Sequence, residues 1–185
     1  MAQQTAKDIL LNDGRLCAAP SSLTTAFPHG GTALGSVRDV IFRPRAKTGF
    51  VTAEEFGGET IEAVQGGESP FLACILRGMD NDMISRVWPN SAAGSVSTDR
   101  VISAPGSNAP GRKRSDDSFA LLFSPNDTAN GRALIIFKAL PIIIEDADIV
   151  FHKREESGVS VVFRAIRNSN GKLYQFGRLE DLSTS

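Results

Sequence analysis

The residues with the clearest chemical potential are glutamates in a stretch without a counter-charge. Between Lys47 and Arg77 the chain contains five glutamates and no lysine or arginine. Paired carboxylates can act as general acid and base when a cleft separates their pKa values, but these lie beside turn residues, which favours a solvated position. A row of carboxylates also repels the phosphates of nucleic acid. The five are Glu54, Glu55, Glu59, Glu62 and Glu68.

Motifs for familiar enzymatic chemistry are absent from the sequence. It has no phosphate-binding GxxxxGKS/T loop, no GxSxG nucleophile elbow and no HExxH zinc motif. The only histidines and cysteines lack the spacing of a zinc site; they are His29, His152, Cys17 and Cys74. Because Cys74 lies in an apolar run, we expect a buried free thiol rather than a disulfide. We predict no enzymatic activity, no metal and no cofactor, with an unrecognised hydrolase as the enzymatic alternative.

A basic run at residues 111–114, with sequence GRKR, is the other local concentration of charge. One interpretation is a patch that binds phosphate, and another is a loop without a special role. The flanking acidic residues favour a third, an exposed loop that pairs with acidic groups on a neighbouring chain. The candidates for such inter-subunit contacts are Arg112, Lys113, Arg114, Asp116 and Asp117.

Length and charge limit the classes of protein further. The chain has 185 residues, close to the usual size of one domain, and a formal net charge of -1. Such a charge is not that of a protein that grips nucleic acid through its phosphates. The chain does not start with a basic segment before a long apolar core, and no apolar stretch approaches the roughly 18 residues of a membrane span. We therefore expect neither a standard secretion signal nor membrane insertion.

The first half of the chain predicts irregular extensions around a β-hairpin. Residues 1–35 are expected to form an extended arm, and residues 36–44 a strand. Residues 49–67 predict two strands joined at Gly57-Gly58, a pair suited to a tight hairpin turn. In that register Glu55 and Glu62 share a face with Val51 and Val64, while Glu54 and Glu59 share the other with Phe50, Phe56 and Ile61. A slip of one residue would exchange the faces.

A short buried helix is expected next, over residues 69–78. Ser69 would be its N-cap, Pro70 its first helical residue and Gly78 the residue after its end. Residues 83–89 suggest another strand. Residues 89–117, rich in Gly, Ser, Pro and Asn, predict a long projecting loop or hairpin.

The C-terminal part predicts a run of strands with turns between them, at residues 118–125, 132–144, 147–153, 159–167 and 172–179. Five or more strands at short spacing indicate an antiparallel sandwich or barrel. The predicted fold class is therefore mainly β, an antiparallel β-sandwich or barrel with one short flanking α-helix and long loop and arm extensions. One domain covers residues 36–182.

This order of elements resembles that of bacteriophage tail tube proteins, the major tail proteins of long-tailed phages. The resemblance lies in element order and texture rather than in a diagnostic motif. It covers about half of the chain, and the most similar stretches are ESPFLACILRG at 68–78, SFALLFSPNDTANGRALIIFKALPI at 118–142, DIVFHKREESGVSVVFRAIRN at 148–168 and GKLYQFGRLEDL at 171–182.

The resemblance implies a structural virion protein that is made in the host cytoplasm and located in the phage tail. In that family, subunits form hexameric rings whose strands join into one continuous inner barrel, and the rings stack into a tube. The implied partners are further copies of the chain, the tape measure protein, the tail terminator and distal tail proteins, and DNA in transient, non-specific passage. Lumen-facing acidic candidates are Glu54, Glu55, Glu59 and Glu62, because carboxylates on the wall would keep DNA from binding.

Two alternatives remain open at this level. A tail terminator or completion protein shares the fold but forms one ring. A monomeric β-sandwich that binds a ligand belongs to a different class; it would need an aromatic platform, yet the chain has one tryptophan and one tyrosine.

Overall fold

The structure is a computed structural model, and it describes residues 9–11, 13–53, 59–77, 83, 86–88, 92–96, 99–103, 113–128, 131–143 and 158–184. Strands dominate the described chain. They are β1 (Ile9–Leu11), β2 (Gly14–Ala18), β3 (Thr32–Arg43), β4 (Ala46–Ala53), β5 (Glu59–Glu68), β6 (Phe71–Arg77), β7 (Ala92–Val96), β8 (Asp99–Ser103), β9 (Phe119–Pro125), β10 (Ala133–Ile143), β11 (Gly158–Ala165) and β12 (Tyr174–Gly177). The described chain also contains two 3-10 helices, η2 (Arg114–Asp117) and η3 (Leu179–Asp181).

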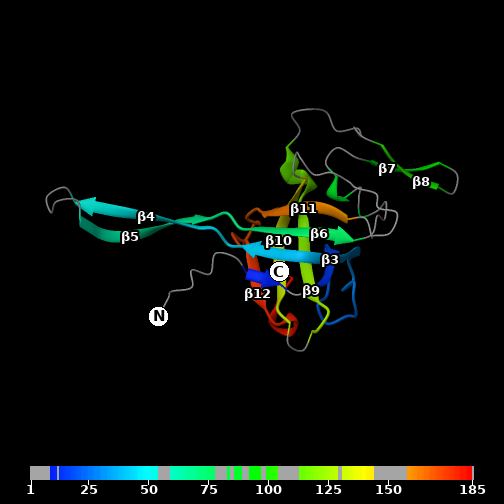
Figure 1. The fold of residues 1–185 in the computed structure, drawn as a ribbon, viewed down its shortest axis with the longest axis horizontal. Helices are drawn as coiled ribbons and strands as arrows, with labels where there is room; N and C mark the ends of the chain where they lie inside the picture. Colours follow the sequence, from blue (N-terminus) through cyan, green and yellow to red (C-terminus); the bar gives the residue numbers. More distant parts are fainter. Residues whose placement is uncertain are drawn as a thin grey trace.

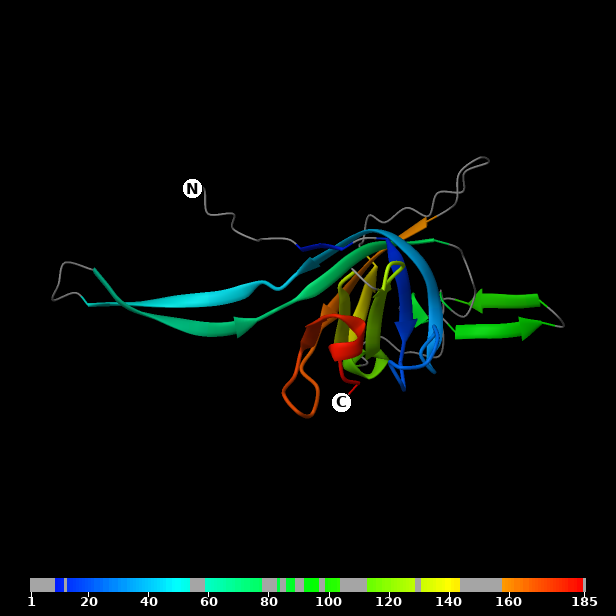
Figure 2. The ribbon, with the colours of Figure 1, turned by 90° about the horizontal axis from the view of Figure 1, so that it is seen from below.

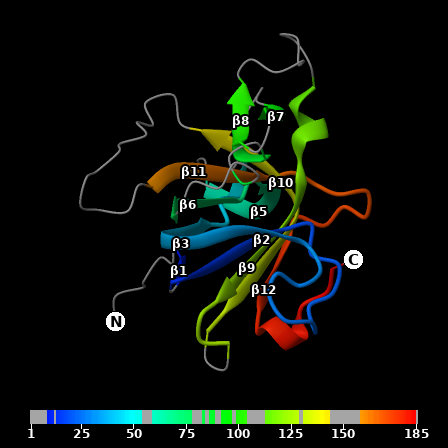
Figure 3. The same ribbon diagram turned by 90° about the vertical axis from the view of Figure 1, so that its right-hand side faces the viewer.

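Six of these strands close into an antiparallel barrel (Figures 1 and 3). The order is β3-β2-β9-β10-β11-β6, and β6 pairs back with β3 to close the ring. Two short strands extend the sheet, because β1 pairs with β3 and β12 pairs with β10. Closure satisfies both backbone edges of each barrel strand within one chain. The predicted fold class, mainly β with an antiparallel sandwich or barrel, is confirmed.

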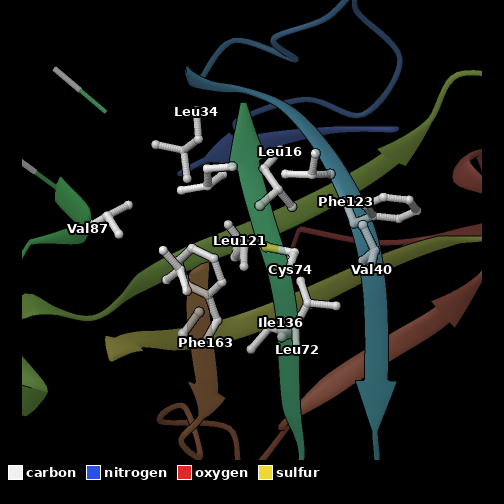
Figure 4. Packing of buried hydrophobic residues seen from close by; sticks show 14 of the residues in the cluster. Leu16, Leu34, Val40, Leu72, Cys74, Val87, Leu121, Phe123, Ile136 and Phe163 are labelled. Carbon is white, nitrogen blue, oxygen red and sulfur yellow. The ribbon is translucent and has the colours of Figure 1, made fainter. Parts of the chain in front are cut away.

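The barrel interior is filled by alternate side chains of the strands (Figure 4). Along β6 the residues alternate between buried and half-buried, with Leu72, Cys74 and Leu76 directed to the core. The neighbouring strand β11 supplies Val161 and Phe163, and Phe163 is fully buried. This two-residue period is the pattern that a pleated strand with one face on the core requires.

A second cluster lies on the other face of the strands β2, β9 and β10. Its buried members are Cys17, Leu122, Ile135 and Phe137. The loop 19–31 and the C-terminal segment cover this cluster with partly buried side chains, which are Leu23, Phe27, Leu179 and Leu182. Part of the barrel wall is therefore apolar on both faces.

The predicted helix at residues 69–78 is wrong, because residues 71–77 form strand β6. The residues of β6 that point away from the core are also apolar and half-buried. The sequence of β6 therefore shows an uninterrupted apolar run and not the alternation of apolar and polar residues that is typical of a strand. Pro70 is compatible with either element because it precedes the first ladder pair of β6, and its carbonyl oxygen accepts a hydrogen bond from the Ala165 N–H at 2.9 Å. Pairing with both β3 and β11 outweighs the weak local signals for a helix.

The segment predicted as a strand at residues 83–89 has helical backbone at its described residues Met83, Arg86 and Val87. Met83 and Val87 are both buried against the core, and Val87 is labelled in Figure 4. They are four residues apart, a spacing that places both on one face of a helix. Helical backbone thus does flank the barrel, but after β6 rather than in its place.

The arm predicted for residues 1–35 is wrong where β2 begins. Residues 14–18 form a barrel strand between β3 and β9, and Leu16, Cys17 and Ala18 in it are fully buried. A side chain at Gly14 would place its Cβ 2.5 Å from the Ser124 carbonyl oxygen, so this close crossing requires glycine. The apolar run in β2 is too short to be recognised from its period alone.

The predicted loop at residues 89–117 contains a hairpin, β7 paired with β8, which projects from the barrel (Figures 1 and 2). The strands β4 and β5 form a longer two-stranded ribbon, which extends in the opposite direction. We call residues 46–68, from the start of β4 to the end of β5, the ribbon. The predicted strand at residues 147–153 lies outside the described residues.

We predict that the protein loses stability at alkaline pH because the thiols of Cys17 and Cys74 are buried. Burial raises the pKa of Cys74 to about 12, and burial is also the main cause that raises the pKa of Cys17 to about 11. In the unfolded chain thiols lose their proton near about pH 8.5. Between about pH 8.5 and 11 the unfolded state therefore binds fewer protons than the folded state, and each thiol lowers the free energy of unfolding by roughly 1 kcal/mol per pH unit.

Urea unfolding of the wild type and of the double variant Cys17→Ala, Cys74→Ala at pH 7 to 10.5 measures this effect. The double variant should start less stable and lose stability less steeply with pH. Equal slopes for the two proteins would contradict the assignment.

Candidate assembly interface

The ribbon is the outer half of one long hairpin. The inner half is the barrel pair β3 and β6, in which Arg43 lies opposite Phe71, and the outer half begins where Ala46 lies opposite Glu68. Pro44 and Pro70 lie at the junction, where a residue that cannot donate to the ladder is tolerated. A bond from the Ser69 N–H to the Arg45 carbonyl oxygen, 3.2 Å long, spans the junction. The ribbon is therefore continuous with two barrel strands.

Side chains at the junction fix the ribbon to the barrel. The guanidinium carbons of Arg45 and Arg43 lie 4.7 Å and 5.7 Å from the ring centroid of Phe71, within the range of cation–π attraction. The Tyr174 side chain is hydrogen-bonded to the Glu68 side chain, and burial, followed by the charge and hydrogen bond of Glu68, raises the pKa of Tyr174. Its ring meets Phe42 edge-on, with centroids 4.8 Å apart. These contacts come from β3, β5, β6 and β12.

Beyond the junction the ribbon is open to solvent on both faces. Each side chain that the structure describes between residues 45 and 66 is exposed. Three of these are large and apolar, namely Phe50 at 67% exposure and Val51 and Val64 at 48% each. An isolated two-stranded ribbon is only marginally stable in water, and both of its outer edges present unpaired backbone groups. A partner that covers the faces or pairs with the edges would stabilise it.

The backbone register decides which residues share a face of the ribbon. Val51 lies opposite Glu62 and Gly49 lies opposite Val64, so Glu62 shares a face with Val51 and Val64. This part of the predicted facing is confirmed, and Phe50, opposite Ala63, lies on the other face.

The remaining acidic candidates are less fully placed. The backbone of Glu59 pairs with Ala53 beyond a register shift between Val51 and Thr52. The side chain of Glu59 lies outside the part of the chain that the structure describes, so its predicted facing stays a prediction. Glu54, Glu55 and the turn at Gly57-Gly58 lie outside the described residues, and the lumen role of all four glutamates stays a prediction.

The basic loop is held by its own chain at one point. The Arg114 guanidinium donates a 2.9 Å hydrogen bond to the Pro141 carbonyl oxygen, which fastens η2 to β10. Lys113 and Asp116 are exposed and stay candidates for contacts between subunits, Asp117 is half-buried, and Arg112 lies outside the described residues. Because this hydrogen bond lies within one chain, it does not support the prediction that Arg114 pairs with another chain.

Two further features, a cavity and a buried histidine, lie in the described part of the barrel domain. A cavity of about 390 Å³ lies between loop 19–31, the turn after β9 and the C-terminal segment; it is lined by Leu23, Thr24, Thr128, Leu179, Glu180 and Leu182. Both ring nitrogens of His29 are buried without a hydrogen-bond partner, and its ring meets Phe27 edge-on. Within the described residues no group of three or more His, Cys, Asp or Glu side chains could hold a metal ion.

Sequence reasoning missed the residues that orient and complement the acidic strand. Arg45 contacts Phe71, and Tyr174 contacts Glu68 and Phe42, through segments that are far apart in the sequence, so no local signal could reveal these contacts. The sequence shows Lys47 as the last basic residue before the stretch of glutamates. Which residue lies opposite it on β5 follows only from the register of the two strands.

No protein-family model matches the chain, and no curated protein matches it. Among the described residues no helix is long and apolar enough to cross a membrane.

Proposed function

We propose that this chain is a structural subunit whose copies form rings that stack into a tube, in the manner of the phage tail tube proteins that its sequence resembles. The observation that carries the proposal is the ribbon. It has two open edges and exposed Phe50, Val51 and Val64, yet it is anchored at its base by specific contacts. A long, exposed, anchored ribbon is more readily explained by assembly than by a monomeric role.

The closed barrel limits how such a ring is built. Since six strands satisfy one another within each chain, a cylinder shared between subunits cannot use their edges. The ribbon edges are available instead, so we propose that ribbons line the shared wall and barrels surround it. The tape measure protein, followed by DNA in transient passage, would occupy the lumen, and terminator and distal tail proteins would cap the stack.

The charge of the ribbon suits a conduit for DNA. Residues 46–68 contain one lysine and five glutamates. Duplex DNA carries one negative charge per about 1.7 Å of its axis, so a basic wall would retain it whereas an acidic wall repels it. Phe50 would meet the surrounding barrels, and the opposite face, which carries both Glu62 and Lys47, is the candidate for the lumen side. The excess of glutamate over lysine in the ribbon would keep this wall acidic.

Electron microscopy of the purified protein, together with sedimentation over a range of concentrations, tests the proposal. We expect rings or tubes whose fraction grows with protein concentration. Single rings that never stack would favour the tail terminator or completion protein instead. A stable monomer at millimolar concentration would contradict the proposal and favour a monomeric ligand-binding module.

A further inference from the structure

The two strands of the ribbon differ in the sign of their charge. Strand β4 contains Lys47 and no acidic residue; Arg45 directly precedes it, and Glu54 and Glu55, outside the described residues, follow it in the sequence. Strand β5 contains Glu59, Glu62 and Glu68 and no basic residue. Because each strand forms one edge of the ribbon, the charged residue within the β4 edge is basic and those within the β5 edge are acidic.

Lys47 and Glu62 lie on one face but are too far apart to pair within a ribbon. The register shift between Lys47 and Thr48 comes from an extra residue on β5, Gly66, so the alternation along β4 is not interrupted. Lys47, Gly49 and Val51 therefore share one face, which is also the face of Glu62. Lys47 lies opposite Gly67 and Glu62 lies opposite Val51, so the two charges are four ladder positions apart, about 14 Å. Both side chains are exposed.

We infer that neighbouring copies join ribbon to ribbon, with the β4 edge of one copy against the β5 edge of the next. The inference rests on the proposed ring and names its contact surface. Joining two β4 edges or two β5 edges would place like charges side by side, whereas β4 against β5 places opposite charges together. Such a contact is heterologous, so it repeats from copy to copy instead of stopping at a dimer, and it forms a ring when the rotation between copies closes.

Strand direction agrees with this arrangement. In a ring with cyclic symmetry all ribbons point the same way, so β5 of one copy runs antiparallel to β4 of the next, and the antiparallel ladder continues from copy to copy. Strands in a closed cylinder are also staggered relative to their neighbours. A stagger of four residues sets Lys47 of one copy opposite Glu62 of the next, and because four is even, both charges stay on the same face.

Charge reversal at the two positions tests the inference. The variants are Lys47→Glu, Glu62→Lys and the double variant, with Arg167→Glu as a matched charge change at an exposed position in the barrel domain. Each single ribbon variant should raise the concentration needed for half-assembly by about tenfold at low salt, and less at high salt. The double variant and the Arg167→Glu control should assemble like the wild type. Circular dichroism checks that every variant is folded.

Mixing the two single variants gives the sharpest result. A Lys47→Glu copy has an acidic β4 edge that fits the altered β5 edge of a Glu62→Lys copy, so an equimolar mixture should assemble although each variant alone does so poorly. If Lys47→Glu behaves like Arg167→Glu, or if the mixture assembles no better than its components, the edge pairing is wrong although the proposed ring stands. If the wild type itself does not assemble, the proposed function fails and the inference with it.

Discussion

Replacement of residues 44–70 by Asn-Gly should leave a folded, soluble barrel that no longer forms rings. Arg43 and Phe71 lie opposite each other in the β3–β6 ladder, so a two-residue hairpin turn can join them directly. The buried core residues that fill the barrel all lie outside the replaced segment. The variant loses the contacts of Arg45 with Phe71 and of Glu68 with Tyr174, which should lower the free energy of unfolding by about 1–3 kcal/mol.

Sedimentation and electron microscopy measure the assembly of this variant, and urea unfolding measures its fold. A matched control shortens the β7–β8 hairpin by replacing residues 93–102 with Asn-Gly, and it should still form rings. Rings of the ribbon-less variant would show that the interface lies elsewhere. A variant without native strand content would show instead that the ribbon is part of the folding unit.

Phe163→Ala should lower the free energy of unfolding by about 3–5 kcal/mol. Phe163 is fully buried in β11 and packs edge-on against Phe119, with ring centroids 6.3 Å apart. Removing its ring leaves a cavity that neighbours in a closed barrel cannot easily fill. Since whole domains are stable by about 5–15 kcal/mol, the variant should be close to unfolding.

Phe50→Ala is the matched control because it makes the same chemical change on an exposed side chain. The stability of its monomer should change by no more than about 0.5 kcal/mol, while its assembly weakens because an apolar contact is lost. Urea unfolding of monomers, below the concentration at which they assemble, compares the two. Equal losses of stability in both variants would contradict the distinction between core and interface.

The fold class was readable from the sequence because the C-terminal strands are separated by clear turns. Strand β6 was not readable because Phe71, Ala73 and Ile75 on its outer side are as apolar as the core side, so no alternation appears. The flanking Ser69 and Pro70 then fit a helix start as well as they fit the end of a ribbon. Pairing with β3 and β11 decides between the two, and such pairing is not local information.

The glutamates of the candidate interface could be predicted from the sequence, but the role of Lys47 on β4 could not. A tight turn at Gly57-Gly58 gives nearly the observed register, which is why Glu62 was correctly placed beside Val51 and Val64. The residue types do not predict the two bulges in the β4–β5 ladder. Each bulge changes which residues of β5 share a face. The separation of charge between β4 and β5 becomes apparent only once each residue is assigned to its edge.

Amide hydrogen exchange, compared between the assembled and the monomeric protein, tests the central claim most directly. If ribbons of neighbouring copies form the shared wall, amides of residues 46–53 and 59–68 exchange slowly in the assembly and rapidly in the monomer, while amides of the closed barrel exchange slowly in both. Ribbon amides that exchange equally fast in both states would contradict the account.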